Sequence, residues 1–263
     1  MPPGKKKPRT YDPARIRTAV TTQFGHVAAA VRGLTPEQLA RSSGLGDWTV
    51  ADLAAHVAWI ADSLAAGLAR PPAAVAELPA VEWPFATASL AGKISEAARE
   101  TLDGAPLPEL YETAAARLAA QLERNAGSRV LDLWIGDMTL ADFLVTRTVE
   151  LVVHTDDLNR AAGLDIPLDR QALAACTRLL ADALAVKAPG GSVEVRIPPF
   201  AVVQCVAGPR HTRGTPPNVV ETDPLTWIRL ATGRTGWAEA LDSARVSASG
   251  ERADLAALLP LMS

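Results

Sequence analysis

The chain has 263 residues, of which 48% are hydrophobic and 21% are charged, so it carries enough apolar side chain for a packed core. This composition excludes a largely disordered protein and a collagen-like one. The net charge of −3 combines +4 from residues 1–9 with −7 from the remainder, where 22 basic residues face 29 acidic ones. Because a mildly acidic body does not neutralise phosphates, nucleic acid is not an expected partner. We expect residues 1–9 to form a short, basic, flexible tail.

The cysteines and the distribution of apolar residues favour a cytoplasmic protein. Cys176 and Cys205 are the only cysteines and form no CxxC pair, which is typical of a reducing compartment. Both are expected to be buried hydrophobic side chains rather than nucleophiles. The basic N-terminus is not followed by an apolar stretch, so no signal peptide is expected. No window approaches about 18 consecutive apolar residues, so no transmembrane helix or membrane insertion is expected either.

The pattern up to about residue 187 predicts helices almost throughout. We expect them over residues 12–31, 35–38, 49–70, 86–103, 108–125, 139–162 and 168–187. The first begins with Asp12 before Pro13, a good helix cap followed by a favoured first-turn residue. Thr49 and Thr139 are each followed three residues later by an aspartate, a capping box with Asp in place of the usual Glu. Together these helices predict a bundle over residues 10–187.

The hydrophobic pattern changes after the Pro-Gly-Gly-Ser segment at 189–192. Strands are predicted at 193–197, 200–206, 218–221 and 245–249, and short helices at 223–233 and 252–259. The segment 188–263 therefore predicts a small α+β domain. The fold class predicted for the whole chain is α+β, mainly α: a helical bundle followed by this small domain.

The predicted helix at 139–162 carries a carboxylate and an imidazole on one face. Glu150 and His154 are spaced i and i+4, so their side chains are neighbours on the helix surface. The helix is apolar nearly all round, which is typical of a buried helix. A buried carboxylate without a partner is costly, so Glu150 needs a cation or a shifted pKa.

Two kinds of cation meet this need. Arg147, three residues before Glu150 on the same face, could form a buried structural ion pair beside a core histidine. Alternatively, Glu150 and His154 could bind a metal ion, and His56 on the predicted helix at 49–70 is the best third ligand. Two histidines and one carboxylate, with room for a water, suit catalytic zinc and other divalent ions. The spacing alone leaves both interpretations open.

Two motifs resemble a known family. The segment GDWTVADLAAH at 46–56 and the pattern R-x-x-E-x-x-x-H-x-x-D at 147–157 are similar to those of the mycothiol-dependent maleylpyruvate isomerase family. The resemblance covers about residues 10–165. It implies that the bundle is a DinB-like four-helix bundle holding a divalent metal, usually zinc, to which the thiol cofactor mycothiol binds.

The same resemblance assigns roles to residues of the two motifs. It implies that His56, Glu150 and His154 are the metal ligands. Arg147 and Asp157 also match motif positions, and we expect them to orient the ligands.

Three further residues are candidates for contacts with small molecules. Trp48 directly precedes the helix of His56 and could line a pocket for the cofactor, although core packing is the simpler interpretation. Arg210 and Arg213 lie in an arginine-rich predicted loop. They could receive an anionic substrate, because a guanidinium matches a carboxylate in a forked geometry. Plain solvation of this loop is the alternative.

The C-terminal part resembles a different group of proteins. The segments RGTPPNVVETDP at 213–224, WIRLATGR at 227–234 and SASG at 247–250 are similar to a bacterial sterol-carrier-protein-type domain. Such domains have a small sheet with helices around an apolar tunnel. The similarity is to a branch without an established activity, and a fold by itself does not specify a reaction.

The sequence therefore predicts a metal-dependent enzyme of the mycothiol-dependent isomerase or S-transferase type. A metal-bound thiolate of mycothiol would attack a small electrophilic substrate. Its catalytic residues would be Arg147, Arg210 and Arg213. The alternative is a non-catalytic carrier that binds a lipid, a sterol or another apolar ligand in the C-terminal domain. A third, structural interpretation is a bundle in which Arg147 and Glu150 pair without an ion.

Overall fold

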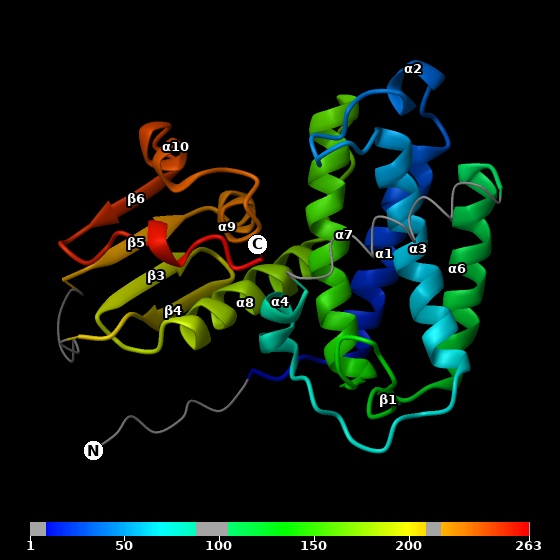
Figure 1. Cartoon of the computed structure of the whole chain (residues 1–263), viewed down its shortest axis with the longest axis horizontal. Coiled ribbons are helices and arrows are strands. Elements are labelled where there is room, and N and C mark those ends of the chain that lie inside the picture. The colour runs from blue at the N-terminus through cyan, green and yellow to red at the C-terminus, as the bar shows by residue number, and fades with distance from the viewer. Residues whose placement is uncertain (1–8, 88–104, 209–216, 263) are drawn as a thin grey trace.

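Four long helices run side by side in the N-terminal half of the molecule (Figure 1). They are α1 (Pro13–Val31), α3 (Val50–Ala69), α6 (Leu107–Arg124) and α7 (Leu140–Ala162). In this computed structural model, which describes residues 9–87, 105–208 and 217–262, α3 packs against α6 and α7, and α1 packs against α6 and α7. These four helices confirm a helical bundle, and the predicted bounds of 10–187 stay a prediction.

The helices begin where the sequence places their caps. Asp12 accepts hydrogen bonds from the first backbone N–H groups of α1. Thr49 and Asp52 form a complete capping box at the start of α3, and the Oγ1 atom of Thr139 accepts from the N–H of Asp142 at 3.1 Å. These caps fix the starts of the two helices that carry the candidate site, because each satisfies a backbone donor that the helix itself cannot.

Short elements connect the long helices. They are α2 (Pro36–Leu39), the 3₁₀ helix η1 (Ala80–Glu82), α4 (Trp83–Ala86), and the paired two-residue strands β1 (Val130–Leu131) and β2 (Met138–Thr139). The helix predicted at 86–103 lies outside the described residues except for its first two positions, where α4 ends. Within the described parts of the chain, no helix combines the length and apolarity needed to cross a membrane.

The C-terminal half is a four-stranded sheet with helices. It comprises α8 (Arg170–Lys187), β3 (Val193–Ile197), β4 (Ala201–Cys205), β5 (Val219–Thr222), α9 (Pro224–Ala231), α10 (Trp237–Asp242), β6 (Val246–Ser249) and the 3₁₀ helix η3 (Ala256–Leu258). The strand order is β4-β3-β5-β6, in which only β3 and β5 are parallel. Alternate residues of β3, namely Val193, Val195 and Ile197, are buried. This confirms the predicted period-two strand and the α+β fold class.

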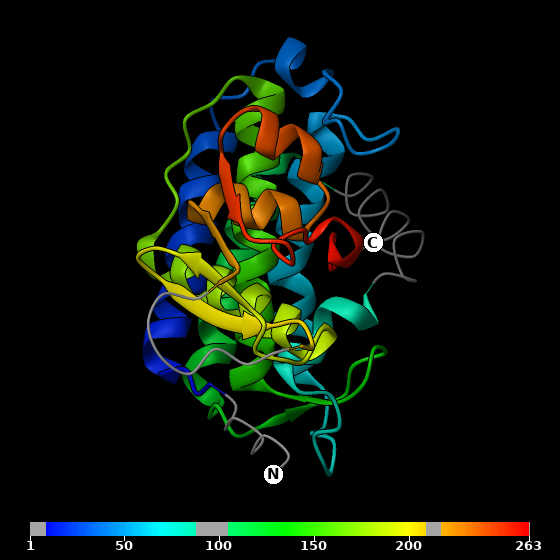
Figure 2. The ribbon, with the colours of Figure 1, turned by 90° about the vertical axis from the view of Figure 1, so that its left-hand side faces the viewer.

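Helix α8 joins the two halves. It packs against α1 and α7 on one side and against β4 and α9 on the other. Viewed from the side, the sheet and α9 lie in front of the bundle (Figure 2). The domain boundary between residues 187 and 188 stays a prediction, as does the tail at 1–9. Of that tail, only Arg9 is described, and its Nε lies 2.8 Å from the Asp182 carboxylate on α8.

Three local features differ from the sequence-based expectation. The strands β1 and β2 and the six-residue helix α10 were not predicted, because elements this short show no measurable period. The helix predicted at 252–259 is reduced to η3. Ala253 and Leu255 are buried there with a spacing of two, which a helix would place on different faces.

Both cysteines are buried as expected, and burial raises the pKa of the Cys205 thiol to about 11.

Replacing Thr139 by Ala should lower the free energy of unfolding by about 1 kcal/mol, because the first turn of α7 loses its side-chain acceptor. Urea unfolding measures this change. Thr21→Ala on the exposed side of α1 is the matched control and should change stability by less than about 0.5 kcal/mol. Equal losses in the two variants would contradict the capping explanation.

Candidate metal centre

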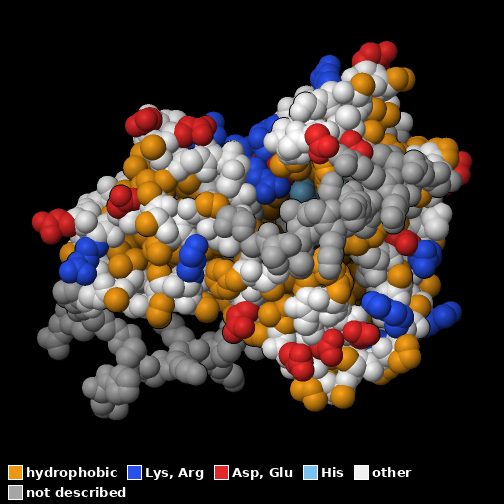
Figure 3. All heavy atoms as spheres, viewed as in Figure 1, with side chains coloured by type: hydrophobic (Ala, Val, Ile, Leu, Met, Phe, Trp, Pro, Cys, Tyr) orange, Lys and Arg blue, Asp and Glu red, His pale blue; other side chains and the backbone are white. Residues whose placement is uncertain are grey.

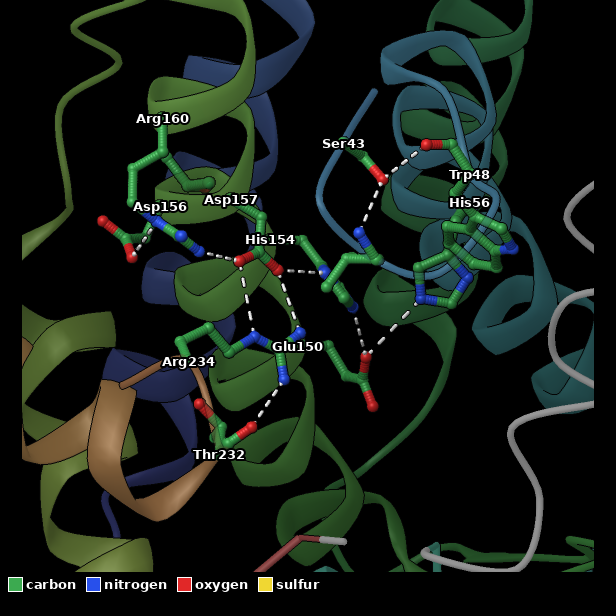
Figure 4. Close-up of polar contacts among 12 residues, drawn as sticks. Ser43, Trp48, His56, Glu150, His154, Asp156, Asp157, Arg160, Thr232 and Arg234 are labelled. Carbon is green, nitrogen blue, oxygen red and sulfur yellow. Dashed lines mark hydrogen bonds and ion pairs between the residues drawn. The ribbon is translucent and has the colours of Figure 1, made fainter. Parts of the chain in front are cut away.

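Three side chains from two helices converge inside the bundle (Figure 4). His56 projects from α3, and Glu150 and His154 project from α7. The Oε2 atom of Glu150 lies 3.2 Å from His154 Nε2 and 3.6 Å from His56 Nε2. One ligand atom from each residue lies within 4.8 Å of the other two. Donors about 2.1 Å from a tetrahedral zinc ion would be about 3.4 Å apart, so this spacing suits a shared ion.

The three residues are largely shielded from water and share their charge. His56 is 3% exposed, His154 8%, and the Glu150 side chain 14%. Burial acts to raise the pKa of Glu150, but hydrogen bonds from both imidazoles and the charge of Arg147 hold that pKa well below its usual value. Glu150 is therefore an anion that is largely enclosed by the bundle.

The two imidazoles differ in their affinity for protons. Burial lowers the pKa of His56, and the hydrogen bond with Glu150 does not offset this effect. Burial also acts to lower the pKa of His154, but hydrogen bonds to Asp157 and Glu150 outweigh it, so the pKa is raised. His56 is consequently the neutral partner, and His154 holds the proton more tightly.

Among the described residues, Arg147 is the arginine that pairs with Glu150, but it does not make the closest contact with that carboxylate. Its Nη2 atom lies 4.0 Å from Glu150 Oε1, whereas both imidazoles approach the carboxylate more closely. Its Cζ atom lies 4.3 Å from the ring centroid of Phe143 and 5.4 Å from that of Trp83. Its Nε and Nη2 atoms donate to Thr146 Oγ1 at 3.3 and 3.2 Å. An Arg147–Glu150 pair alone therefore does not account for the cluster.

The donor set fits a divalent metal. Two imidazole nitrogens and one carboxylate oxygen are a ligand set of catalytic zinc sites. The Nδ1 atom of His154 donates to Asp157 Oδ2 at 3.1 Å, which leaves Nε2 without a proton and directed at Glu150 when the imidazole is neutral. The Nδ1 atom of His56 is buried and has no hydrogen-bond partner within the described residues.

Asp157 links this cluster to the C-terminal half. Its side chain is wholly buried, and its Oδ2 atom also accepts from Arg234 Nη2 at 2.9 Å (Figure 4). Arg160 donates to its other oxygen. Burial acts to raise the pKa of Asp157, but the hydrogen bond from His154 and the charges of His154 and Arg234 hold it well below the usual value. Asp157 thus lies where the sequence expects a residue that orients a ligand.

Two tryptophan rings lie beside His56. The ring centroids of Trp48 and Trp59 lie 5.2 and 5.7 Å from that of His56. The space-filling view shows a hollow with a histidine side chain at its floor and Lys or Arg side chains beside it (Figure 3). The structure therefore places Trp48 beside the candidate metal site, and its role in binding a cofactor stays a prediction.

The remaining sequence-based candidates do not join the cluster. Arg210 and Arg213 lie outside the described residues, so their predicted contacts with substrate stay predictions. His26 is on α1, away from the ligands, with its Nδ1 atom 3.0 Å from the carbonyl oxygen of Pro167. The sequence missed Arg234, which belongs to the quoted C-terminal motif. Its only signal was membership of that motif, since nothing local pairs it with a residue 77 positions earlier.

Comparison with known proteins gives two family matches. The family model described as mycothiol maleylpyruvate isomerase N-terminal domain matches residues 20–159. The one described as bacterial SCP ortholog matches residues 169–261. These matches confirm both resemblances. No curated protein matches the chain.

Two similar solved structures support the fold. A crystal structure of the mycothiol-dependent maleylpyruvate isomerase has a TM-score of 0.58 and 19% sequence identity. A structure of a mutant of that enzyme, with one histidine replaced by alanine, has a TM-score of 0.59 and 18% identity. Each match covers 94% of this chain and 97% of the other. At this identity the likeness shows a shared fold over nearly the whole length.

Zinc affinity should fall as the pH is lowered, because a proton competes with the metal for His154 Nε2. The pKa of His154 is raised and that of His56 is lowered, so His154 is the imidazole that must lose a proton. Below the raised pKa of His154, the affinity should drop about tenfold per pH unit, and above it the affinity should level off. Competition with a chromophoric chelator across about pH 5.5 to 8.5 measures this profile. A profile without pH dependence would contradict the assignment.

Proposed function

The chain belongs to the family defined by the mycothiol maleylpyruvate isomerase N-terminal domain, and on this basis we propose that it is a metal-dependent enzyme of the mycothiol-dependent isomerase or S-transferase type. The observation that carries the proposal is the convergence of His56, Glu150 and His154 within the matched region. The substrate would be a small electrophile, which a thiolate attacks by addition to a conjugated double bond or by substitution.

The ligand residues set the charge of the site. A divalent ion bound there lowers the pKa of a coordinated thiol, so that the thiol of mycothiol is held as thiolate near neutral pH. Glu150 contributes one negative charge and the two imidazoles contribute none, which leaves positive charge for an anionic sulfur. Asp157 keeps the proton of His154 on Nδ1, away from the ligand atom.

Arg147 contributes a second positive charge near the reacting groups. It is buried against Phe143 and Trp83, so its electrostatic effect is screened less than that of a surface arginine. Its position 4.0 Å from Glu150 favours the ionised carboxylate and, in the proposal, stabilises negative charge that develops on the substrate. We retain Trp48 as a candidate contact with the cofactor and Arg210 and Arg213 as candidate contacts with the substrate.

The proposed chemistry has two outcomes from one attack. Addition of the thiolate to a conjugated carbon–carbon double bond turns that bond into a single bond, which can rotate. Loss of the thiolate then restores the double bond in the other geometry and returns the cofactor, which gives isomerisation. If the anionic adduct instead takes up a proton from water and keeps the carbon–sulfur bond, or if the thiolate displaces a leaving group that departs with its bonding electrons, the product is a thioether conjugate.

The match of residues 169–261 favours a second candidate function, a non-catalytic carrier of a lipid or sterol. Packing in that part of the chain argues against it. Val195, Ile197 and Cys205 on the inner face of the sheet are fully buried, and β4 packs against α8. An apolar ligand bound there would have to displace these core side chains. Saturable binding of a fluorescent fatty acid to the full chain would restore this candidate.

Removal of the metal should abolish thiol-dependent activity. With mycothiol present, conversion of maleylpyruvate or alkylation by monochlorobimane should stop after treatment with a chelator and return when zinc is added. His154→Ala should lower the rate by more than about 100-fold, since it removes a ligand rather than an outer hydrogen-bond partner. His26→Ala is the matched control and should leave the rate unchanged, because the hydrogen bond of His26 within the described residues is to the carbonyl of Pro167 and involves none of the candidate ligands. Activity that survives complete metal removal would contradict the proposal.

A further inference from the structure

We propose that Arg234, from the C-terminal half, is a positioning residue for the metal ligand His154 and couples zinc affinity to that half of the chain. The inference rests on the proposed metal centre. It concerns a contact between residues that belong to different family matches, since Arg234 lies in the segment 169–261 and its partner Asp157, like His154, lies in the segment 20–159.

The turn after α9 directs Arg234 towards α7. Gly233 has a φ of +74°, a left-handed conformation that glycine adopts without steric cost, and it reverses the chain at the end of α9. The backbone N–H of Arg234 donates to the carbonyl of Arg229 at 2.7 Å, and its Nη1 donates to the carbonyl of Thr232 at 2.9 Å. The guanidinium is therefore held by its own turn, with Nε and Nη2 left to contact α7.

Those two donors meet the carboxylate that holds the metal ligand. Arg234 Nη2 lies 2.9 Å from Asp157 Oδ2, and Nε lies 3.3 Å from Oδ1. Oδ2 is also the atom that accepts from His154 Nδ1. Because one oxygen serves both partners, the fork of Arg234 fixes the carboxylate and thereby the orientation of the imidazole ring. Arg160 contacts only the other oxygen.

A neighbouring contact provides a comparison within the same molecule. Arg229 on α9 binds the adjacent Asp156 with two bonds, of 2.8 and 2.6 Å. Asp156 is bonded to Arg229 and Arg160 and to none of the three candidate ligands among the described contacts. The two arginines thus bind consecutive aspartates of α7 in the same manner, but only the aspartate that Arg234 binds is itself hydrogen-bonded to a candidate ligand. Figure 4 shows Asp157 between Arg234 and His154.

The experiment measures zinc affinity of the full chain by competition with a chromophoric chelator at one pH. Arg234→Gln should weaken zinc binding about tenfold, the lower end of the range for outer hydrogen-bond partners of a ligand. Arg229→Gln loses an equivalent contact between the halves and should change the affinity by less than about twofold. Asp157→Asn should weaken binding about 10- to 100-fold. Adding Arg234→Gln to Asp157→Asn should then have little further effect, because the two residues act through one route.

Wild-type affinity in Arg234→Gln would overturn the inference while leaving the metal centre intact. Equal losses in Arg234→Gln and Arg229→Gln would also overturn it, since the effect would then come from attachment of the halves in general. Independent, additive losses in Asp157→Asn and Arg234→Gln would overturn the route through Asp157. If the wild-type chain binds no zinc, the proposed metal centre itself fails, and the inference with it. Thermal unfolding in the presence of chelator verifies that each variant folds. If Arg234→Gln does not fold, Arg234→Lys replaces it under the same criteria, because lysine keeps the positive charge but cannot form the two parallel hydrogen bonds of a guanidinium.

Discussion

A carboxylate placed at the centre of a helical bundle has to be compensated, and the surroundings of Glu150 follow from this constraint. Two imidazoles contact one of its oxygens, a buried guanidinium lies near the other, and a fully buried aspartate holds the more basic imidazole. The histidine nitrogens are closer to the carboxylate than Arg147 is, and their spacing around Glu150 is compatible with a shared divalent ion.

Helix α7 serves both the site and the assembly of the two halves. Its middle turns carry Glu150 and His154, and the next turn carries Asp156 and Asp157, which bind arginines of the C-terminal half. The same helix therefore presents ligands to the bundle interior and carboxylates to its neighbour. Because the two sets are less than one turn apart, attachment of the C-terminal half bears directly on the geometry of a ligand. The fully buried Asp157 belongs to both sets.

Local chemistry was sufficient to predict the helix starts and the pairing of Glu150 with His154 on one helix face, while long-range pairings were not predictable. The caps at Asp12, Thr49 and Thr139 act within one turn, so they are visible in the sequence. Glu150 and His154 share one helix face for the same reason, and His56 came from the family resemblance and the need for a third donor. The pairing of Arg234 with Asp157 spans 77 residues and depends on how the sheet half sits on α7, which no local pattern encodes.

The metal content of the chain, purified without chelator and measured by elemental analysis beside the His56→Ala variant, tests the central claim most directly. The account predicts about one divalent ion per chain, lost in the variant, because His56 is the one candidate ligand on α3 and α7 alone supplies only two. A native protein without metal, even after zinc is supplied, would contradict it. Glu150 would then be balanced by a protonated imidazole and Arg147, and the cluster would be a structural feature of the bundle.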